Sequence, residues 1–542
     1  MLNGLTQKQI DFLKKIKVGY YNNDGQVCVH DEHASEVTEL KEILQSSTTI
    51  AEGKFLGLEP QIIVVPKEKV MRNLLELGAE EKVDETEVSK LLNEILTEAL
   101  DLSASDIHVI VTEIETIIMA RIDGRLVTLD KWERKGNFGK SILSYAFIHK
   151  GSASDFSLKS DDDATFSETL TKKESTPKEY DWRLSQINTV NGAKATIRNL
   201  DSSEIDENPS LDDLGLSPGH TFYLKQCLRN SQGAILLSGP TGSGKTTTIC
   251  SGLLYASEDK GILIHALEDP VEWKLKPHNI VQTRVDPTAL ISEDQDGYKD
   301  FSYYGKKLLR NDTDKVFIGE IRDHEVAKTL LRMANTGQVA VATLHCNSAI
   351  DIMSTLMDQM GVNPSLLGQK GAILALAHQR LIRKVCQYCG KSHVEQGKNY
   401  ANLNTSDREA FDKVKSLIDK HFVVGPIYST EEEVEKLKGV ALTNIKYQNP
   451  EGCNRCNGGE KGRTCLFEMI LLDDKARQYI RNKDLAGWEE NLKSTNWPSI
   501  QDHGLAKVFK GIADIRTVES EVSDLDQKPL TEINAEFRER IG

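Results

Sequence analysis

The sequence lacks features that would place it across a membrane or along a nucleic acid. No apolar stretch approaches the roughly 20 residues of a transmembrane helix, and Met1–Gln9 lacks the basic and apolar regions of a secretion signal. A basic excess is also missing, because 82 acidic residues against 67 basic ones give a formal net charge of −15. This balance argues against broad, sequence-independent nucleic-acid binding but leaves room for a local basic patch. We therefore expect a cytoplasmic protein with no direct nucleic-acid partner.

Cysteine is scarce and unevenly placed. Four of the nine cysteines form two C-x-x-C pairs, Cys386 with Cys389 and Cys453 with Cys456, and the other five are scattered. This pattern indicates metal ligation in a reducing compartment rather than disulfides. Four thiolates suit a tetrahedral structural zinc and leave no open position for a catalytic one. The gap between the pairs is long, so we interpret 395–447 as a helical insertion that leaves and re-enters at one place; chance pairing or reduced structural cysteines is the alternative.

The pattern G-x-x-x-x-G-K-[ST] of a phosphate-binding loop is present, with an apolar run before it and a helix-like stretch after it. Glycines let successive N–H groups point at a polyphosphate, and the following helix adds its positive N-terminal end. Lys245 would reach the β- and γ-phosphates, and the Thr246 hydroxyl would complete the shell of a Mg²⁺ ion. The alternative is a glycine-rich surface turn. The predicted nucleotide-binding residues are Gly239, Pro240, Thr241, Gly242, Ser243, Gly244, Lys245, Thr246 and Thr247.

The chain of 542 residues is too long for one hydrophobic core, so we expect several domains. Apolar strands alternate with helices around and after the phosphate loop, which predicts an α/β fold with a mostly parallel sheet. Within an earlier α/β stretch, the polar segment Ser152–Lys178 is expected to be a mobile loop. The predicted segments are a small N-terminal domain (1–88), a second α/β domain (89–203), a linker (204–219), a core with the phosphate loop (220–383), a cysteine subdomain with the insertion (384–465) and a C-terminal helical part (466–542).

Acidic residues follow two of the predicted strands. Glu268 and Glu272 come directly after one apolar strand, and Glu320 follows a later one. Hydrolysis of a nucleoside triphosphate needs a carboxylate that orients or deprotonates water and an acidic group near Mg²⁺, both delivered beside the loop. Helix caps or solvated turns are the alternative reading of these acids.

These segments carry a family resemblance. Leu267–Glu272, Gly319–Asp323, Thr336–Gln338 and Thr343–His345 resemble the aspartate box, Walker B segment and histidine box of the ATPases that power type II secretion and type IV pili. The resemblance implies a RecA-like P-loop ATPase domain that uses ATP and Mg²⁺. It also implies that Glu272 activates water, that Glu320 helps to hold Mg²⁺ and water, and that His345 senses the γ-phosphate. A lone histidine there would more often be a satisfied core or turn residue.

The resemblance extends upstream of the loop. Ala104–His108, Arg121–Gly124 and Asp181–Ser185 are similar to the second N-terminal domain of the same family. Family members use arginines of this domain as fingers that reach an ATP across a subunit boundary, a role that falls on Arg183, Arg198 and Arg121. Arg121 ranks below the other two, because Met119 stands where the family commonly has another arginine. Strand arginines with solvated head groups are the alternative.

The cysteine pairs and the additional N-terminal domain are similar to assembly and secretion ATPases rather than to retraction ATPases. We therefore expect a divergent ATPase of pilus assembly, most similar to the type IVb class, with zinc in its cysteine subdomain. The resemblance implies a homo-hexamer that acts peripherally at the inner membrane on a platform protein, and residues 1–88 are candidates for docking another cytoplasmic-side assembly protein. A pseudopilus ATPase of type II secretion, a DNA-transfer ring ATPase and a nucleotide-dependent scaffold are the alternatives.

Overall fold

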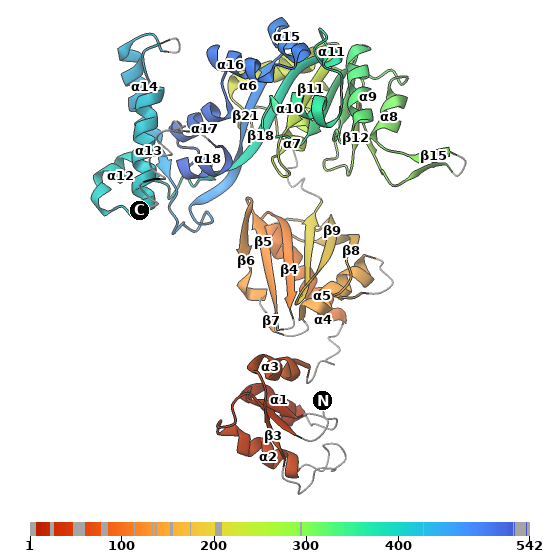
Figure 1. Ribbon diagram of the computed structural model, residues 1–542, viewed down its shortest axis with the longest axis vertical. Coiled ribbons are helices and arrows are strands. Elements are labelled where there is room, and N and C mark those ends of the chain that lie inside the picture. Colours follow the sequence, from red (N-terminus) through yellow and green to blue (C-terminus); the bar gives the residue numbers. More distant parts are fainter. Residues whose placement is uncertain are drawn as a thin grey trace. The chain divides into compact units, whose positions relative to one another are not determined.

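The computed structural model describes residues 7–21, 26–46, 60–76, 85–112, 114–132, 134–135, 138–151, 156–173, 175–200, 209–292, 295–425, 428–523, 525 and 538. The chain divides into two compact units, Met1–Ser202 and Ser203–Gly542 (Figure 1). Residues 204–208 of the predicted linker lie outside the described residues. After them, Leu211 and Leu216 are buried in a core of the second unit.

The first unit begins with a small three-stranded sheet in the order β1-β2-β3. Its strands are β1 (Gly19–Tyr21), β2 (Val27–Val29) and β3 (Ile62–Val64), and its helices are α1 (Gln7–Ile16), α2 (Glu36–Ser46) and α3 (Lys67–Glu76). Each helix contributes an apolar residue to one core, for example Leu13, Leu40 and Val70. This core joins the three helices to the small sheet.

A second sheet in this unit has seven strands, in the order β6-β5-β4-β10-β9-β8 with β7 paired to β5. The strands are β4 (Ala104–Thr112), β5 (Glu115–Ile122), β6 (Arg125–Thr128), β7 (Arg134–Lys135), β8 (Asp162–Leu170), β9 (Lys178–Thr189) and β10 (Gly192–Asn199). All these pairings are antiparallel. Helices α4 (Glu85–Asp101) and α5 (Phe138–Tyr145) share a core with alternate strand residues such as Ile107 and Val109. The alternation leaves the remaining strand side chains on the other face of the sheet.

The expectation of a mobile loop over Ser152–Lys178 is wrong for its central part. Residues 162–170 form the strand β8, which pairs with β9 along its whole length. Phe166 and Leu170 are buried in the same core as α4. Most of the other residues of β8 are polar, and several of them are exposed. The composition of this edge strand therefore resembles that of a loop.

The second unit is built on a seven-stranded sheet in the order β13-β12-β16-β17-β11-β18-β21. The strands are β11 (Gly233–Ser238), β12 (Ile264–Glu268), β13 (Ile280–Arg284), β16 (Lys315–Ile318), β17 (Val339–Leu344), β18 (Ile373–Val385) and β21 (Glu460–Leu471). Neighbouring strands are parallel except for β18 and β21. The predicted mostly parallel sheet is therefore confirmed. The carboxyl ends of β11, β12, β16 and β17 meet at one edge.

Both faces of this sheet are covered. Ala234 and Leu236 of β11 belong to one core, and Ile235 and Leu237 belong to the other. Helices α6 (Pro218–Arg229) and α7 (Lys245–Ala256) pack in the second of these cores. The first core contains residues of α8 (Phe301–Leu308), α9 (His324–Asn335), α10 (Asp351–Ser354), α11 (Pro364–Leu367), α15 (Asp474–Asn482) and α16 (Leu485–Ser494). This two-sided burial explains why β11 reads as a continuous apolar run.

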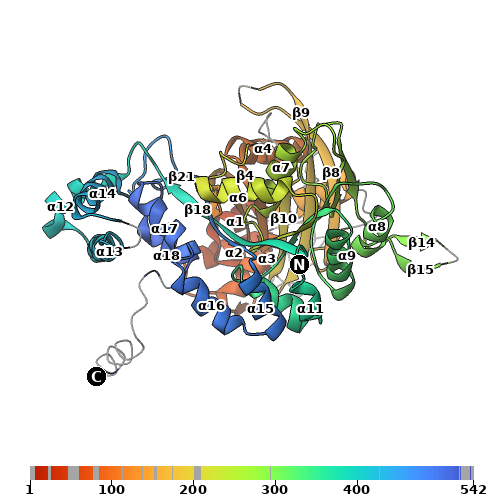
Figure 2. The ribbon, with the colours of Figure 1, turned by 90° about the horizontal axis from the view of Figure 1, so that it is seen from above.

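The segment predicted to be a helical insertion begins and ends at one place in the second unit. Short strands β19 (Lys391–Ser392) and β20 (Lys446–Tyr447) pair with each other and close it at its base. Between them lie α12 (His393–Lys398), α13 (Thr405–His421) and α14 (Glu431–Asn444), which gather at one end of the second unit with α17 (Ile500–Phe509) and α18 (Ile515–Glu521) (Figures 1 and 2). At the other end, strands β14 (Leu290–Ser292) and β15 (Gln295–Tyr298) form a projecting hairpin.

Candidate nucleotide site and metal centre

The predicted phosphate loop lies between the end of β11 at Ser238 and the start of α7 at Lys245. Gly239 has a φ of 153°, and a Cβ there would lie 2.3 Å from the carbonyl oxygen of Gln379. Gly244 is left-handed, with a φ of 81°, and precedes the first residue of α7. Both positions therefore need glycine, one for a close backbone approach and one for the turn into the helix. The turn brings the loop to the N-terminus of α7, where anions bind favourably.

Lys245 is buried at 9% exposure and its ammonium group lies inside the loop. Its Nζ donates to the carbonyl oxygens of Gly239 at 2.7 Å and Pro240 at 3.0 Å. Burial lowers the pKa of Lys245, and the nearby carboxylates of Glu320 and Glu272 oppose that shift. Two carboxylates thus act electrostatically on the predicted phosphate-binding cation.

The aspartate-box acids occupy different environments after β12. Glu268 is 2% exposed and accepts a hydrogen bond from the Gln282 side chain at 2.8 Å. Burial raises the pKa of Glu268 to about 7. Glu272 lies farther along the same connection and is exposed. An exposed carboxylate can exchange a proton with water at the open edge, whereas Glu268 is held within the fold.

Glu320 follows β16 and lies beside His345, the histidine-box residue. Its carboxylate lies 2.6 Å from the Nε atom of Arg322 and 3.3 Å from the Nε2 atom of His345. Arg322 also lies 3.8 Å from the carboxylate of Asp269. The edge of the sheet thus brings the aspartate-box, Walker B and histidine-box segments together, as the parallel register requires. The individual catalytic roles of Glu272, Glu320 and His345 remain predictions.

The four predicted cysteine ligands form one cluster, in which all four Sγ atoms lie within 4.8 Å of one another. Sγ separations are 3.9 Å for Cys386 and Cys453, and 3.6 Å for Cys389 and Cys456. A tetrahedral zinc with bonds of about 2.3 Å requires sulfur separations of about 3.8 Å. The four thiols therefore fit a structural zinc ion, held where β18 ends and shortly before β21 begins.

The three predicted arginines lie in one row across the second sheet of the first unit. Register pairs Arg121 with Asp106, Asp106 with Arg198, and Arg198 with Arg183 across four neighbouring strands. Directly paired residues share a face of a sheet, so the row is a stripe of cations around one carboxylate. Asp106 is 5% exposed and lies 2.7 Å from the Nε atom of Arg198. This ion pair orients Arg198, whose side chain is still 55% exposed.

Residues 81–520 match the family described as type II/IV secretion system protein. The chain belongs to this family. The predicted resemblance is confirmed, and the protein is a secretion ATPase by family. None of the described helices combines the length and hydrophobicity needed to cross a bilayer.

Curated relatives carry two different functional names. The type IV pilus assembly ATPase PilB of Thermus thermophilus is 29% identical over 441 residues, covering 81% of this chain and 43% of that protein. The type II secretion system ATPase E of Vibrio cholerae is 30% identical over 444 residues, covering 81% of this chain and 76% of that protein. The chain therefore spans less than half of the Thermus relative, and the names do not decide between pilus assembly and secretion.

The fold is shared with a solved structure. The Legionella pneumophila ATPase DotB is 16% identical with a TM-score of 0.51, over 80% of this chain and 95% of that chain. Together with the doubly covered parallel sheet, this likeness confirms the predicted α/β ATPase fold of the secretion ATPase family.

Sequence reasoning missed a polar triplet on β18, His378, Gln379 and Arg380, of which the first two are buried. Gln379 is 1% exposed, accepts a hydrogen bond from the Thr248 hydroxyl and donates to the Ser243 carbonyl oxygen, both at 2.7 Å. It therefore braces the phosphate loop against α7. The available signal was the polar run His378-Gln379-Arg380, which follows the apolar first part of β18.

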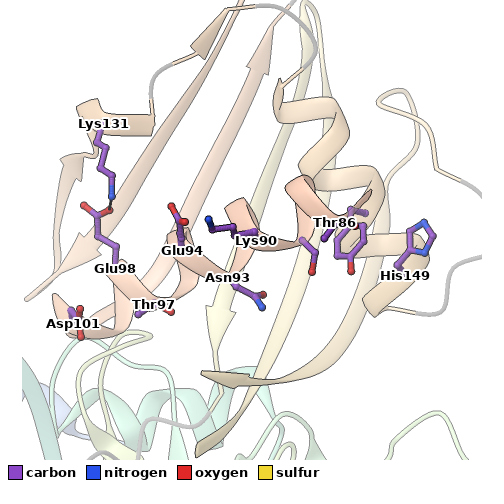
Figure 3. Close-up of a pocket in the computed structure, with 11 residues that line it drawn as sticks. Thr86, Lys90, Asn93, Glu94, Thr97, Glu98, Asp101, Lys131 and His149 are labelled. Atoms are coloured by element: carbon purple, nitrogen blue, oxygen red, sulfur yellow. Dashed lines mark ion pairs between the residues drawn. The ribbon is translucent and has the colours of Figure 1, made fainter. Parts of the chain in front are cut away.

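A separate hollow of about 960 Å³ belongs to the first unit alone (Figure 3). The exposed side of α4 lines most of it with polar side chains, and Lys131 and Glu98 point toward each other at one end of it, 3.6 Å apart. Tyr145 and His149 line its other end. This hollow has neither a glycine-rich loop nor a carboxylate pair at strand ends, so we do not assign it to phosphate chemistry.

Proposed function

We propose that this chain is a cytoplasmic ATPase whose hydrolysis of ATP drives pilin polymerisation in type IV pilus assembly. The observation that carries the proposal is the convergence of the phosphate loop, Glu272, Glu320 and His345 at one edge of the sheet. The cysteine cluster supports an assembly or secretion role, because the resemblance associates such a cluster with those two branches.

In the proposed reaction, a water oxygen attacks the γ-phosphorus of ATP, and the bond from that phosphorus to the β,γ-bridging oxygen breaks. Glu272 accepts the proton of the attacking water, and ADP and inorganic phosphate are the products. Lys245 exchanges its two carbonyl contacts for the β- and γ-phosphates, which offer charge-assisted hydrogen bonds. His345, beside Glu320, would report on the γ-phosphate.

Thr246 and Glu320 would hold Mg²⁺, since hydroxyl and carboxylate oxygens are the donors this ion prefers. Mg²⁺ supplies charge neutralisation on the phosphates when it is bound. Glu320 is held beside Lys245 and His345 by the strand end that precedes it, so its carboxylate is available at the loop.

The arginine row completes the proposal. Arg183 and Arg198, with Arg121 beside them, would reach the phosphates of a neighbouring subunit in a homo-hexameric ring. A guanidinium suits this task because it stays charged and grips phosphate oxygens in a fork. Head-to-tail contacts of this kind close into rings when the rotation permits.

ATP hydrolysis would move an inner-membrane platform protein, and residues 1–88 would bind a further assembly protein. A pseudopilus ATPase of type II secretion is the second candidate, favoured by relatives such as the Vibrio cholerae ATPase at similar identity and greater coverage. A DNA-transfer ATPase and a slow nucleotide-dependent scaffold are the more distant alternatives.

The test measures steady-state ATP turnover of the full chain with membrane vesicles containing candidate platform proteins, and with DNA. The proposal expects stimulation by a pilus platform and none by DNA. Stimulation only by a type II secretion platform would favour the second candidate, and stimulation by DNA would favour the translocase. Loss of the gene should correspondingly abolish surface pili while leaving protein secretion intact.

A further inference from the structure

Arg380 lies in a cavity beside the phosphate loop and has no part in the machinery predicted from the sequence. The cavity measures about 390 Å³ and is lined by Gly239, Pro240, His345 and Arg380 among other residues. It therefore adjoins both the first residues of the loop and the predicted γ-phosphate sensor. This volume far exceeds the roughly 30 Å³ that one water molecule occupies, which leaves room for a hydrated phosphate ion.

A buried histidine fixes the guanidinium of Arg380. Its Nε atom donates to Nε2 of His378 at 3.3 Å, so the proton of His378 lies on Nδ1. That Nδ1–H donates to the Ser238 hydroxyl at 2.9 Å, at the end of β11. His378 is fully buried, and burial, reinforced by the charges of Arg380 and Lys245, lowers its pKa to about 3. The imidazole is therefore neutral and orients Arg380 without cancelling its charge.

Arg380 has an acidic neighbour but no hydrogen bond at its terminal nitrogens. Glu521 of α18 forms an ion pair with Nη1 at 3.9 Å, a separation beyond hydrogen-bonding distance. Asp351 also lines the cavity. Within the described part of the chain, no hydrogen bond joins either Nη atom of Arg380 to another residue. A guanidinium with both Nη groups available can bind two oxygens of one phosphate.

We propose that Arg380 binds a phosphate group in this cavity, acting from the same subunit as the phosphate loop. The inference rests on the proposed ATPase function, because that reaction brings phosphate to the loop. The group has two possible sources, the γ-phosphate of bound ATP and the inorganic phosphate that hydrolysis releases. Both are polyanionic tetrahedral phosphates, so the same guanidinium suits either.

The test uses the full chain with Arg380→Gln, and with Arg332→Gln as a matched control at an exposed position on α9. Three quantities are measured: affinity for ADP, affinity for a non-hydrolysable ATP analogue, and inhibition of ATP turnover by added inorganic phosphate. Loss of a charge-assisted hydrogen bond predicts a change of about tenfold. If the γ-phosphate is the ligand, analogue affinity falls about tenfold while ADP affinity stays within about twofold. If released phosphate is the ligand, the inhibition constant for phosphate rises about tenfold instead.

Unchanged values for all three quantities in Arg380→Gln would overturn the inference. If wild-type protein does not hydrolyse ATP, the proposed function itself fails, which is a distinct result. Arg380→Met, which retains an aliphatic stem in the cavity, replaces the glutamine variant if that variant is unstable. Failure of both variants to fold, with Arg332→Gln folded, would assign Arg380 to stability alone and would also overturn the inference.

Discussion

The two large sheets of this protein present charge in different ways. The antiparallel sheet of the first unit carries Arg121, Arg198 and Arg183 in a row across its face, around the single carboxylate of Asp106. The parallel sheet of the second unit is covered on both faces and presents Glu272 and Glu320 only at its carboxyl edge. The comparison teaches that a half-covered sheet can offer cations from its strands, whereas a fully covered one must use its strand ends. In our account these are the two halves of one catalytic site, contributed by different subunits.

Lys245→Ala should have the largest effect, because it removes the phosphate-binding cation from the part of the site that the second unit contributes. Because the ammonium balances phosphate charge directly, we expect ATP turnover to fall below detection and nucleotide affinity to drop by about 100-fold or more. Calorimetric nucleotide binding and phosphate release measure these effects. Lys328→Ala, at an exposed position on α9, is the control and should behave as wild type. Wild-type turnover in Lys245→Ala would remove the loop from the mechanism.

Glu272→Gln should separate binding from chemistry. Only the proton acceptor is removed, so we expect ATP affinity within about twofold of wild type and turnover lower by about 10²–10⁴-fold. Glu320→Gln should also slow hydrolysis but should additionally raise the Mg²⁺ concentration needed for half-maximal turnover. Equal turnover of Glu272→Gln and wild type would exclude Glu272 as the base, and an unchanged Mg²⁺ titration would exclude Glu320 from the metal shell.

Removing the cysteine cluster tests a feature that belongs neither to the arginine row nor to the carboxyl edge of the parallel sheet. Cys386→Ser combined with Cys453→Ser breaks both C-x-x-C pairs, so we expect loss of about one zinc per chain and faster amide exchange around residues 384–465. ATP affinity should change less than about twofold. Cys227→Ser, which lies outside the cluster, controls for the general effect of losing a thiol. Full zinc occupancy in the double variant, or no zinc in wild-type protein, would contradict the assignment.

The smallest expected effect concerns stability and pH. Burial raises the pKa of Glu268 from 4.5 to about 7, so the folded state binds its proton more tightly than the unfolded state. The resulting stabilisation is complete below pH 4.5 and is lost as the pH rises through about 7. Glu268→Gln cannot ionise, so its stability relative to wild type should increase from pH 5 to pH 8, by about 3 kcal/mol at most. Thermal unfolding midpoints across this range measure the effect, and parallel pH profiles would contradict it.

The sequence predicted the sheet of the second unit well because its signals are local. Apolar runs such as Ala234–Leu237 mark strands buried on both faces, and the phosphate loop fixes the following turn and helix. It failed at Asp162–Leu170, where half of an edge strand is solvent-facing and the composition resembles a loop. It also missed Gln379 and Arg380, because the pairing of β18 with β11 is what brings these residues to the phosphate loop. That pairing is a property of the folded sheet, and the polar run His378-Gln379-Arg380 does not by itself reveal it.

The most direct test of the central claim mixes two inactive subunits in one ring. Arg198→Ala subunits keep the base, and Glu272→Gln subunits keep the arginine finger. If the finger acts in trans, about one quarter of the interfaces in a ring mixed one to one pair an intact finger with an intact base. The account predicts that mixing restores up to about a quarter of wild-type turnover in rings shown to contain both subunits. No recovery in such rings would show that the arginine row and the carboxylate edge do not meet across a subunit boundary.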